Sequence, residues 1–323
     1  MASGSPSTDM QRYLLSRIGQ AALVLWAAFT IAFVLLQALP GDALMIKYQN
    51  PEMGLSPEEI EDIRASYGAE SPLFLQYLHS LGGFLSGNLG YSVQAGVPVV
   101  EQLATNLPAT LALAGLGFLA AVVLAVSIAF LASLATFGWL RNAIQSLPSL
   151  FVSVPVFWLG IVLIQVFSFQ LKLIPVINPP EALGLVLPVA TLAIPISAPL
   201  AQVLIRSIDD VRTQPFVAVA RSRGGSNAWV LGHHVAKNAV LPALTIAGVL
   251  LGELIGGAVV TETVFGRNGI GQLTQQAVNS QDAAVLQAVV VLAAAAFVLV
   301  NLAVDLLYPV LDPRLKRKTG ALT

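Results

Sequence analysis

Long apolar runs dominate the pattern of hydrophobic and polar positions along this chain. Six of these runs reach the roughly 20 residues that a helix needs to cross a bilayer. They lie at 18–39, 107–137, 147–169, 183–205, 239–264 and 284–311. The third and fourth runs contain prolines, which membrane helices tolerate where neighbouring groups satisfy the freed carbonyls. The pattern predicts an all-α, polytopic membrane protein with six transmembrane helices.

The composition agrees with lipid as the main solvent. Charged residues make up only 10% of the 323 positions, whereas soluble domains carry about 25%. The net charge is −1 and no broad basic patch is present, so nothing indicates nucleic-acid binding. Cysteine is absent, which excludes disulfides and thiolate metal sites. The chain also lacks Gly-x-Ser-x-Gly and His-Glu-x-x-His motifs, and we therefore expect no catalytic residues.

The distribution of Lys and Arg predicts that both termini are cytoplasmic. The apolar run that follows Arg17 is too long for a typical signal peptide and no small-residue cleavage site follows it, so we expect the first helix to be retained. Short cytoplasmic loops are enriched in basic residues. With the N-terminus inside, twelve of the 16 basic residues are cytoplasmic and four are external (Lys47, Arg64, Lys172 and Arg267).

The chain contains two long polar segments, and the first of them divides it into three parts. Residues 1–39 are a cytoplasmic tail and the first transmembrane helix, 40–106 are an external helical segment, and 107–323 are a core with five transmembrane helices. In the external segment, Ser56-Pro57 and Ser71-Pro72 are typical helix starts, and residues 87–90 favour a turn. These helices either cover the membrane surface or contact an extracellular partner, and the sequence leaves both interpretations open.

The second polar segment, 206–238, is predicted to lie on the cytoplasmic side as a helix–turn–helix. Gly224 and Gly225 lie where a turn needs a residue that adopts positive φ, and Ser226 is a candidate N-cap for the second helix. The apolar positions that suit two short amphipathic helices are Val211, Phe216, Val219, Val230 and Leu231. By its own pattern, the segment is an interfacial helix pair with a basic rim.

Two stretches of this segment resemble a known family. The sequences AVARSRG at 218–224 and HVAKNAVLP at 234–242 are similar to the "EAA loop" of ABC importer permeases, and more narrowly to the dipeptide/oligopeptide/nickel permease family. Further motifs, in matching order, resemble the first membrane subunit of that family. They lie at 39–42, 76–78, 87–90, 262–265, 269–271, 300–308 and 312–314.

The resemblance implies a type I ABC importer permease that forms half of the translocation pathway for small peptides. The implied partners are a homologous second permease, two ATPase subunits (identical or a heterodimer), an extracellular substrate-binding protein and the lipid of a bacterial or archaeal inner membrane. ATP and Mg are expected on the ATPase subunits, with no cofactor in this chain, because the segment 266–272 lacks the Lys-Ser/Thr ending of a phosphate loop. A nickel or metal-chelate importer is the alternative, because no large external insertion separates the third and fourth spans. A secondary transporter is a distant third, since inverted repeats are not evident.

The resemblance also assigns residues that contact the ATPase. By this match, the coupling positions are Ala218, Val219, Ala220, Arg221, Arg223 and Gly224. The general family pattern has an acidic residue where this chain has Ala218. Docking is therefore expected to depend on packing and on the two arginines rather than on a carboxylate.

Three polar or aromatic residues inside the predicted spans are candidates for the translocation pathway: Glu253, Trp158 and Gln165. A charged side chain at a helix centre costs about 2.5–3.5 kcal/mol on insertion scales, so Glu253 should face a polar cavity or a partner. It either contacts a cationic group of the substrate or bridges helices near Gly252, Gly256 and Gly257. For Trp158 and Gln165, a buried structural role is equally open. His233 and His234 are adjacent and lack a third ligand, so no metal site is expected.

Overall fold

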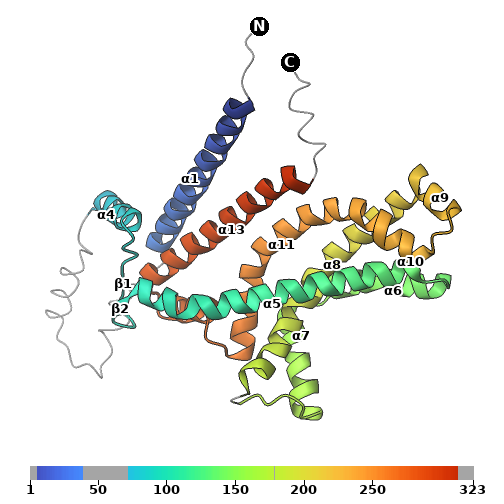
Figure 1. Cartoon of the computed structure of the whole chain (residues 1–323). Coiled ribbons are helices and arrows are strands. Elements are labelled where there is room, and N and C mark those ends of the chain that lie inside the picture. The colour runs from blue at the N-terminus through green and yellow to red at the C-terminus, as the bar shows by residue number, and fades with distance from the viewer. Residues whose placement is uncertain (1–5, 39–71, 178, 312–323) are drawn as a thin grey trace, which may run out of the picture. The chain divides into compact units, whose positions relative to one another are not determined.

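The computed structural model describes residues 6–38, 72–177 and 179–311, with side chains throughout except at 6–15, 37–38, 255 and 304–311 (Figure 1). The prediction of an all-α fold is confirmed. In this part of the chain, the regular elements are helices apart from one β-hairpin, whose two strands have two residues each. The elements are α1 (Pro6–Ala38), α4 (Leu73–Leu85), β1 (Tyr91–Ser92), β2 (Val97–Pro98), α5 (Val99–Leu134), α6 (Gly138–Ser153), α7 (Val156–Leu163), the π-helical η2 (Ile164–Gln170), α8 (Glu181–Arg212), α9 (Pro215–Ser222), α10 (Asn227–Val230), the π-helical η3 (Leu231–Val235), α11 (Ala236–Phe265), α12 (Ile270–Asn279) and α13 (Ala283–Leu311).

Five of the described helical segments are long and apolar enough to cross a membrane. They are Ser16–Leu36, Val99–Leu134, Glu181–Arg212, Asn227–Leu254 and Ala283–Ala303. They correspond to the first, second, fourth, fifth and sixth predicted spans. As expected, α8 remains helical although it contains Pro188, Pro195 and Pro199.

The third predicted span differs from a straight helix. There, α6 and the segment α7–η2 meet at an angle of 103°. Val154 has extended backbone angles (φ −93°, ψ 122°) and Pro155 follows it. A proline supplies no N–H to continue the helical hydrogen bonds and disfavours helix in the residue before it. The described chain therefore has six spans only if this bent pair counts as one.

The chain forms two compact units, 1–108 with 268–299 and 109–267 with 300–323. In the first unit, Val99 and Leu103 of α5 pack with buried residues of α12 and α13. In the second unit, α5, α8 and α11 share a core that also receives residues from α9, α10 and η3. This second core holds the predicted coupling loop in place.

In the first unit, α4 packs on α1 through aromatic contacts. The ring of Tyr77 lies edge-on to Phe29 and Phe33, and its hydroxyl is 2.9 Å from that of Thr30. This helix begins directly after Pro72, as predicted. The helix predicted at Ser56 lies outside the described residues.

A turn and two further elements complete the first unit. Gly87 and Gly90 have φ of +83° and +89°, and Asn88 Oδ1 accepts a hydrogen bond from the Gly90 N–H. The predicted turn at 87–90 is therefore confirmed. The hairpin β1–β2 and the helix α12 have no counterpart in the sequence-based prediction, because each is too short for a strong periodic signal.

Candidate coupling loop and pathway residues

The predicted coupling loop begins with a very short connection between α8 and α9. α8 continues to Arg212, so only Thr213 and Gln214 separate it from α9. The N–H of Thr213 donates to the carbonyl of Asp210 (3.3 Å), and the N–H of Gln214 donates to the carbonyl of Val211 (3.1 Å). The loop is thus shorter than 206–238, and α9 follows the last turn of α8 almost directly.

The two glycines after α9 have different structural roles. Gly224 has φ of +86°, and a Cβ at this position would meet open space. At Gly225, a Cβ would lie 2.9 Å from the Ala220 carbonyl oxygen and 2.9 Å from Val230 Cγ2. Gly224 is therefore needed for its backbone conformation, whereas Gly225 is needed for close packing between α9 and α10.

The second half of the loop runs directly into the fifth span. The Oγ of Ser226 accepts a hydrogen bond from the N–H of Trp229 at 3.3 Å, so the predicted N-cap is confirmed. From Asn227 onward, α10 continues through η3 into α11. The second short helix is thus the first turn of the membrane helix rather than a separate element, and α9 lies beside it (Figure 1).

The predicted coupling residues lie on two sides of α9 and its turn. Ala220 is buried, together with Val217, in the core that α8 and η3 share. Ala220 therefore packs α9 onto α8 and η3 of the same chain and does not face a partner. The remaining predicted coupling positions are exposed: Ala218, Val219, Arg221, Arg223 and Gly224.

Two large side chains outside the family motif extend this exposed surface. Phe216 is 42% exposed and Trp229 is 46% exposed, comparable to Val219 at 51%. Residues 216 and 219 have the same spacing as 217 and 220, so periodicity alone does not show which pair faces the core. We call Phe216, Val219, Trp229, Arg221 and Arg223 the coupling surface.

The two histidines of the loop surround Trp229. His233 stacks on its ring at a centroid distance of 5.2 Å, and His234 contacts it edge-on at 4.9 Å. Both histidines thus pack against an aromatic ring, and no group of three potential metal ligands occurs among the described residues.

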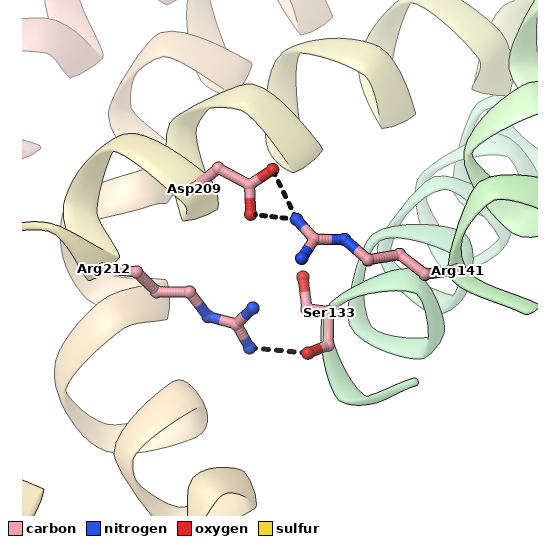
Figure 2. A network of polar contacts seen from close by, with 4 residues as sticks. All are labelled: Ser133, Arg141, Asp209 and Arg212. Carbon is pink, nitrogen blue, oxygen red and sulfur yellow. Dashed lines mark hydrogen bonds and ion pairs between the residues drawn. The ribbon is translucent and has the colours of Figure 1, made fainter. Parts of the chain in front are cut away.

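A polar network lies where α8 leads into the loop (Figure 2). Nη2 of Arg141, on α6, donates to both carboxylate oxygens of Asp209 at 2.9 and 3.0 Å. Nη2 of Arg212 donates to the carbonyl oxygen of Ser133, near the end of α5, at 2.7 Å. We call these four residues the basal network. Its partners are far apart in the sequence, so spacing could not reveal it.

Glu253 lies on an exposed face of α11. The exposed residues Thr245, Val249, Gly256 and Val260 recur with it at helical spacing. The opposite face, with Leu250, Leu254 and Ala258, is buried in the core. Within the described part of the chain, no hydrogen bond or ion pair involves the Glu253 carboxylate. Close helix packing instead occurs at Gly257, where a Cβ would lie 3.0 Å from Leu192 Cδ2.

Trp158 and Gln165 are also exposed, together with Ile161 on one side of α7 and η2. The other side of α7 bears Gly160, where a Cβ would lie 3.0 Å from Val264 Cγ1 and 3.4 Å from Thr191 Cγ2. α7 thus packs on α8 and α11 through its Gly160 side, and Trp158 and Gln165 are directed away from that contact. In the part of the chain that the structure covers, no polar or ring contact joins them to Glu253.

The sequence of this chain is similar to those of known transport proteins over nearly its whole length. Residues 117–317 match the family "Binding-protein-dependent transport system inner membrane component", and residues 10–114 match the N-terminal region of such membrane components. A probable peptide ABC transporter permease protein of Sinorhizobium fredii is 35% identical over 312 residues, which cover 94% of this chain and 99% of the relative. The glutathione transport system permease protein of Escherichia coli K12 is 30% identical over 309 residues, or 96% of this chain and all of that protein.

Solved structures show the same fold in more distant proteins. An inward-facing structure of the methionine ABC transporter MetNI matches with a TM-score of 0.56 at 18% identity, over 65% of this chain and 96% of that one. An amino acid ABC transporter matches with a TM-score of 0.51, also at 18% identity, over 65% of this chain and 94% of that one. The family match covers most of the described helices, including the coupling loop. The chain therefore belongs to the inner membrane components of binding-protein-dependent transport systems, as a multi-pass permease subunit of an ABC importer.

Proposed function

We propose that this permease forms half of the translocation pathway of an ATP-driven importer for small peptides. The supporting observation is near full-length similarity to two permeases, one named for peptides and one for glutathione, which is itself a tripeptide. Neither of these relatives is named for nickel, and no group of three metal ligands occurs among the described residues. The nickel alternative therefore rests only on the short connection between η2 and α8.

The exposed faces of the described chain support the expected set of partners. The coupling surface presents large apolar groups beside two arginines, which is typical of the centre of a protein interface. We assign it to a cleft on a cytoplasmic ATPase subunit, where Phe216 and Val219 insert and the arginines meet acidic groups. Two such ATPases, identical or different, bind ATP and Mg, and both termini of this chain lie on their side of the membrane.

The face of α11 around Glu253 supports a second permease subunit. A carboxylate that no described residue pairs is costly against lipid, so this face is expected to line a shared polar pathway. Peptides carry a cationic amino terminus at neutral pH, and a carboxylate is a suitable partner for it. We assign Glu253 to this contact. Trp158 on α7 and Gln165 on η2 lie on the exposed side of this segment, away from its packing against α8 and α11. An extracellular binding protein delivers the peptide.

Peptide uptake by cells that lack other peptide importers tests this function. Expression of the chain with its second permease, its ATPases and its binding protein should give uptake of a labelled tripeptide that stops when an ATPase subunit is deleted. Labelled nickel measured in the same cells should not accumulate. Uptake that survives deletion of the ATPase and collapses with the proton gradient would identify a secondary transporter instead.

A further inference from the structure

The basal network ties the last turn of α8 to two other helices of the second unit. Arg141 and Asp209 join α8 to the first turn of α6, and Arg212 joins α8 to the end of α5 through the Ser133 carbonyl (Figure 2). Asp209 and Arg212 are three residues apart, so they lie on the same side of the last turn of α8. One helical turn therefore holds both neighbours at once.

This turn is the point at which motion of the coupling loop enters the membrane helices. Only two residues separate it from α9, and both are hydrogen-bonded back to α8. The turn is also held by packing, since Ile208, which is adjacent to Asp209 and one helical turn before Arg212, is 1% exposed within the shared core. The basal network adds polar ties to α5 and α6, and without it this packing alone would hold the turn when α9 is displaced.

The exposure of the network indicates that its residues orient the helices and contribute little to the stability of the fold. The side chains of Arg141 and Asp209 are 40% and 38% exposed. Ion pairs of this exposure contribute little to the free energy of unfolding. The contact of Arg141 Nη2 with both carboxylate oxygens nevertheless ties the first turn of α6 to the last turn of α8. Loss of the pair is therefore expected to change how the helices move together while the fold persists.

We propose that Arg141, Asp209 and Arg212 are positioning residues that make α5, α6 and α8 move as one rigid body with α9. The inference rests on the proposed importer function, because it assigns to these residues the transfer of ATPase motion to the pathway. When the ATPases displace α9, the network passes this displacement to all three helices rather than to a local bend of α8.

The first test measures coupling in the complete importer, reconstituted in proteoliposomes with its loaded binding protein. Asp209→Asn and Arg141→Gln should each lower peptide uptake per ATP hydrolysed about fivefold, with ATP hydrolysis within twofold of the unchanged protein. The exchanged pair, Arg141→Asp with Asp209→Arg, should recover at least half of the lost coupling. Asp210→Asn is the matched control, because Asp210 is an exposed neighbour on α8 and should leave coupling unchanged.

Two outcomes of this test overturn the proposal. In the first, both single variants keep the uptake per ATP of the unchanged protein. In the second, coupling and thermal stability fall together in the single variants and the exchanged pair restores neither, which shows a purely structural role.

A second test does not depend on the substrate. This chain contains no cysteine, so within it spin labels attach only at introduced sites, and it is labelled before the other subunits are added. The exposed residues Trp139 on α6 and Arg206 on α8 are suitable. The mean distance between the labels should be the same with and without bound ATP. In the Asp209→Asn background, the distribution of this distance should become broader. A distance that changes with ATP in the otherwise unchanged complex overturns rigid-body motion. If peptides are not imported, the proposed function fails, but this measurement still decides the inference.

Discussion

The hydroxyl of Thr110 on α5 donates a 2.6 Å hydrogen bond to the carboxyl group of Glu262 on α11. Both side chains are buried, with Thr110 6% and Glu262 1% exposed. A buried acid is costly unless hydrogen bonds satisfy it. Glu262 also accepts the Arg267 N–H at its backbone carbonyl, at 2.9 Å. It therefore joins two spans at the point where α11 ends.

We predict that Thr110→Val lowers the free energy of unfolding by about 1–3 kcal/mol, because the buried carboxyl group loses a donor. Thermal unfolding of the purified protein in detergent, followed by circular dichroism, measures this effect. Thr110→Ser is the matched control, since it keeps the hydroxyl and should unfold close to the unchanged protein. Equal unfolding temperatures for the Val and Ser variants would show that the hydrogen bond does not contribute.

The turn between α9 and α10 gives a second prediction, in which two adjacent glycines respond differently. Gly225→Ala places a methyl group 2.9 Å from the Ala220 carbonyl oxygen, so α9 must move away from α10. Gly224→Asn adds a side chain in open space at φ +86°, a region that Asn enters more readily than most residues. We expect Gly225→Ala to reduce peptide uptake at least tenfold and Gly224→Asn to reduce it less than threefold. The reverse order in the uptake assay would mean that close packing at this turn is not required.

Apolar run length and local turn chemistry predicted much of this fold from the sequence. Five spans, the start of α4 after Pro72 and the Ser226 cap follow from local patterns that need no distant partner. The bend at Pro155 did not follow, because a proline inside an apolar run is compatible with either a continuous or a broken membrane helix.

The candidate site was predictable only in part. Local sequence placed the coupling loop, but the orientation of α9 depends on which of two equally spaced pairs meets the core, and that core is assembled from α8 and η3. The side on which Phe216 lies was therefore not predictable, and the structure places it on the exposed one. The Arg141–Asp209 pair joins residues 68 positions apart, so only the tertiary structure reveals it.

The two faces of α9 lead to a third prediction. Val219→Asp places a charge on the coupling surface, where Val219 is 51% exposed, and should abolish binding-protein-stimulated ATP hydrolysis without changing the unfolding temperature. Val217→Asp buries a charge at a position that is 1% exposed and should prevent stable folding. Co-purification of the ATPase with each folded variant measures docking directly. Normal co-purification of the ATPase with Val219→Asp would place the contact elsewhere.

The carboxylate of Glu253 gives the last prediction, which concerns recognition of the peptide in the pathway. If this carboxylate contacts the cationic amino terminus, Glu253→Gln removes a charge-assisted hydrogen bond worth about 1.5–3 kcal/mol. We therefore expect the KM for uptake of a free tripeptide to rise about tenfold or more. Uptake of the N-acetylated tripeptide, which has no charge at that end, should stay the same in both proteins.

A matched variant and a second readout separate this role from assembly of the two permeases. Thr245→Val changes an exposed polar residue on the same face of α11 and should leave the preference for the free amino terminus intact. If Glu253 instead pairs with the second permease, Glu253→Gln should reduce co-purification of the two subunits, and uptake of both peptides should fall equally. Selective loss of the free peptide with normal co-purification therefore assigns Glu253 to the pathway, because only a contact with the substrate distinguishes the two peptides.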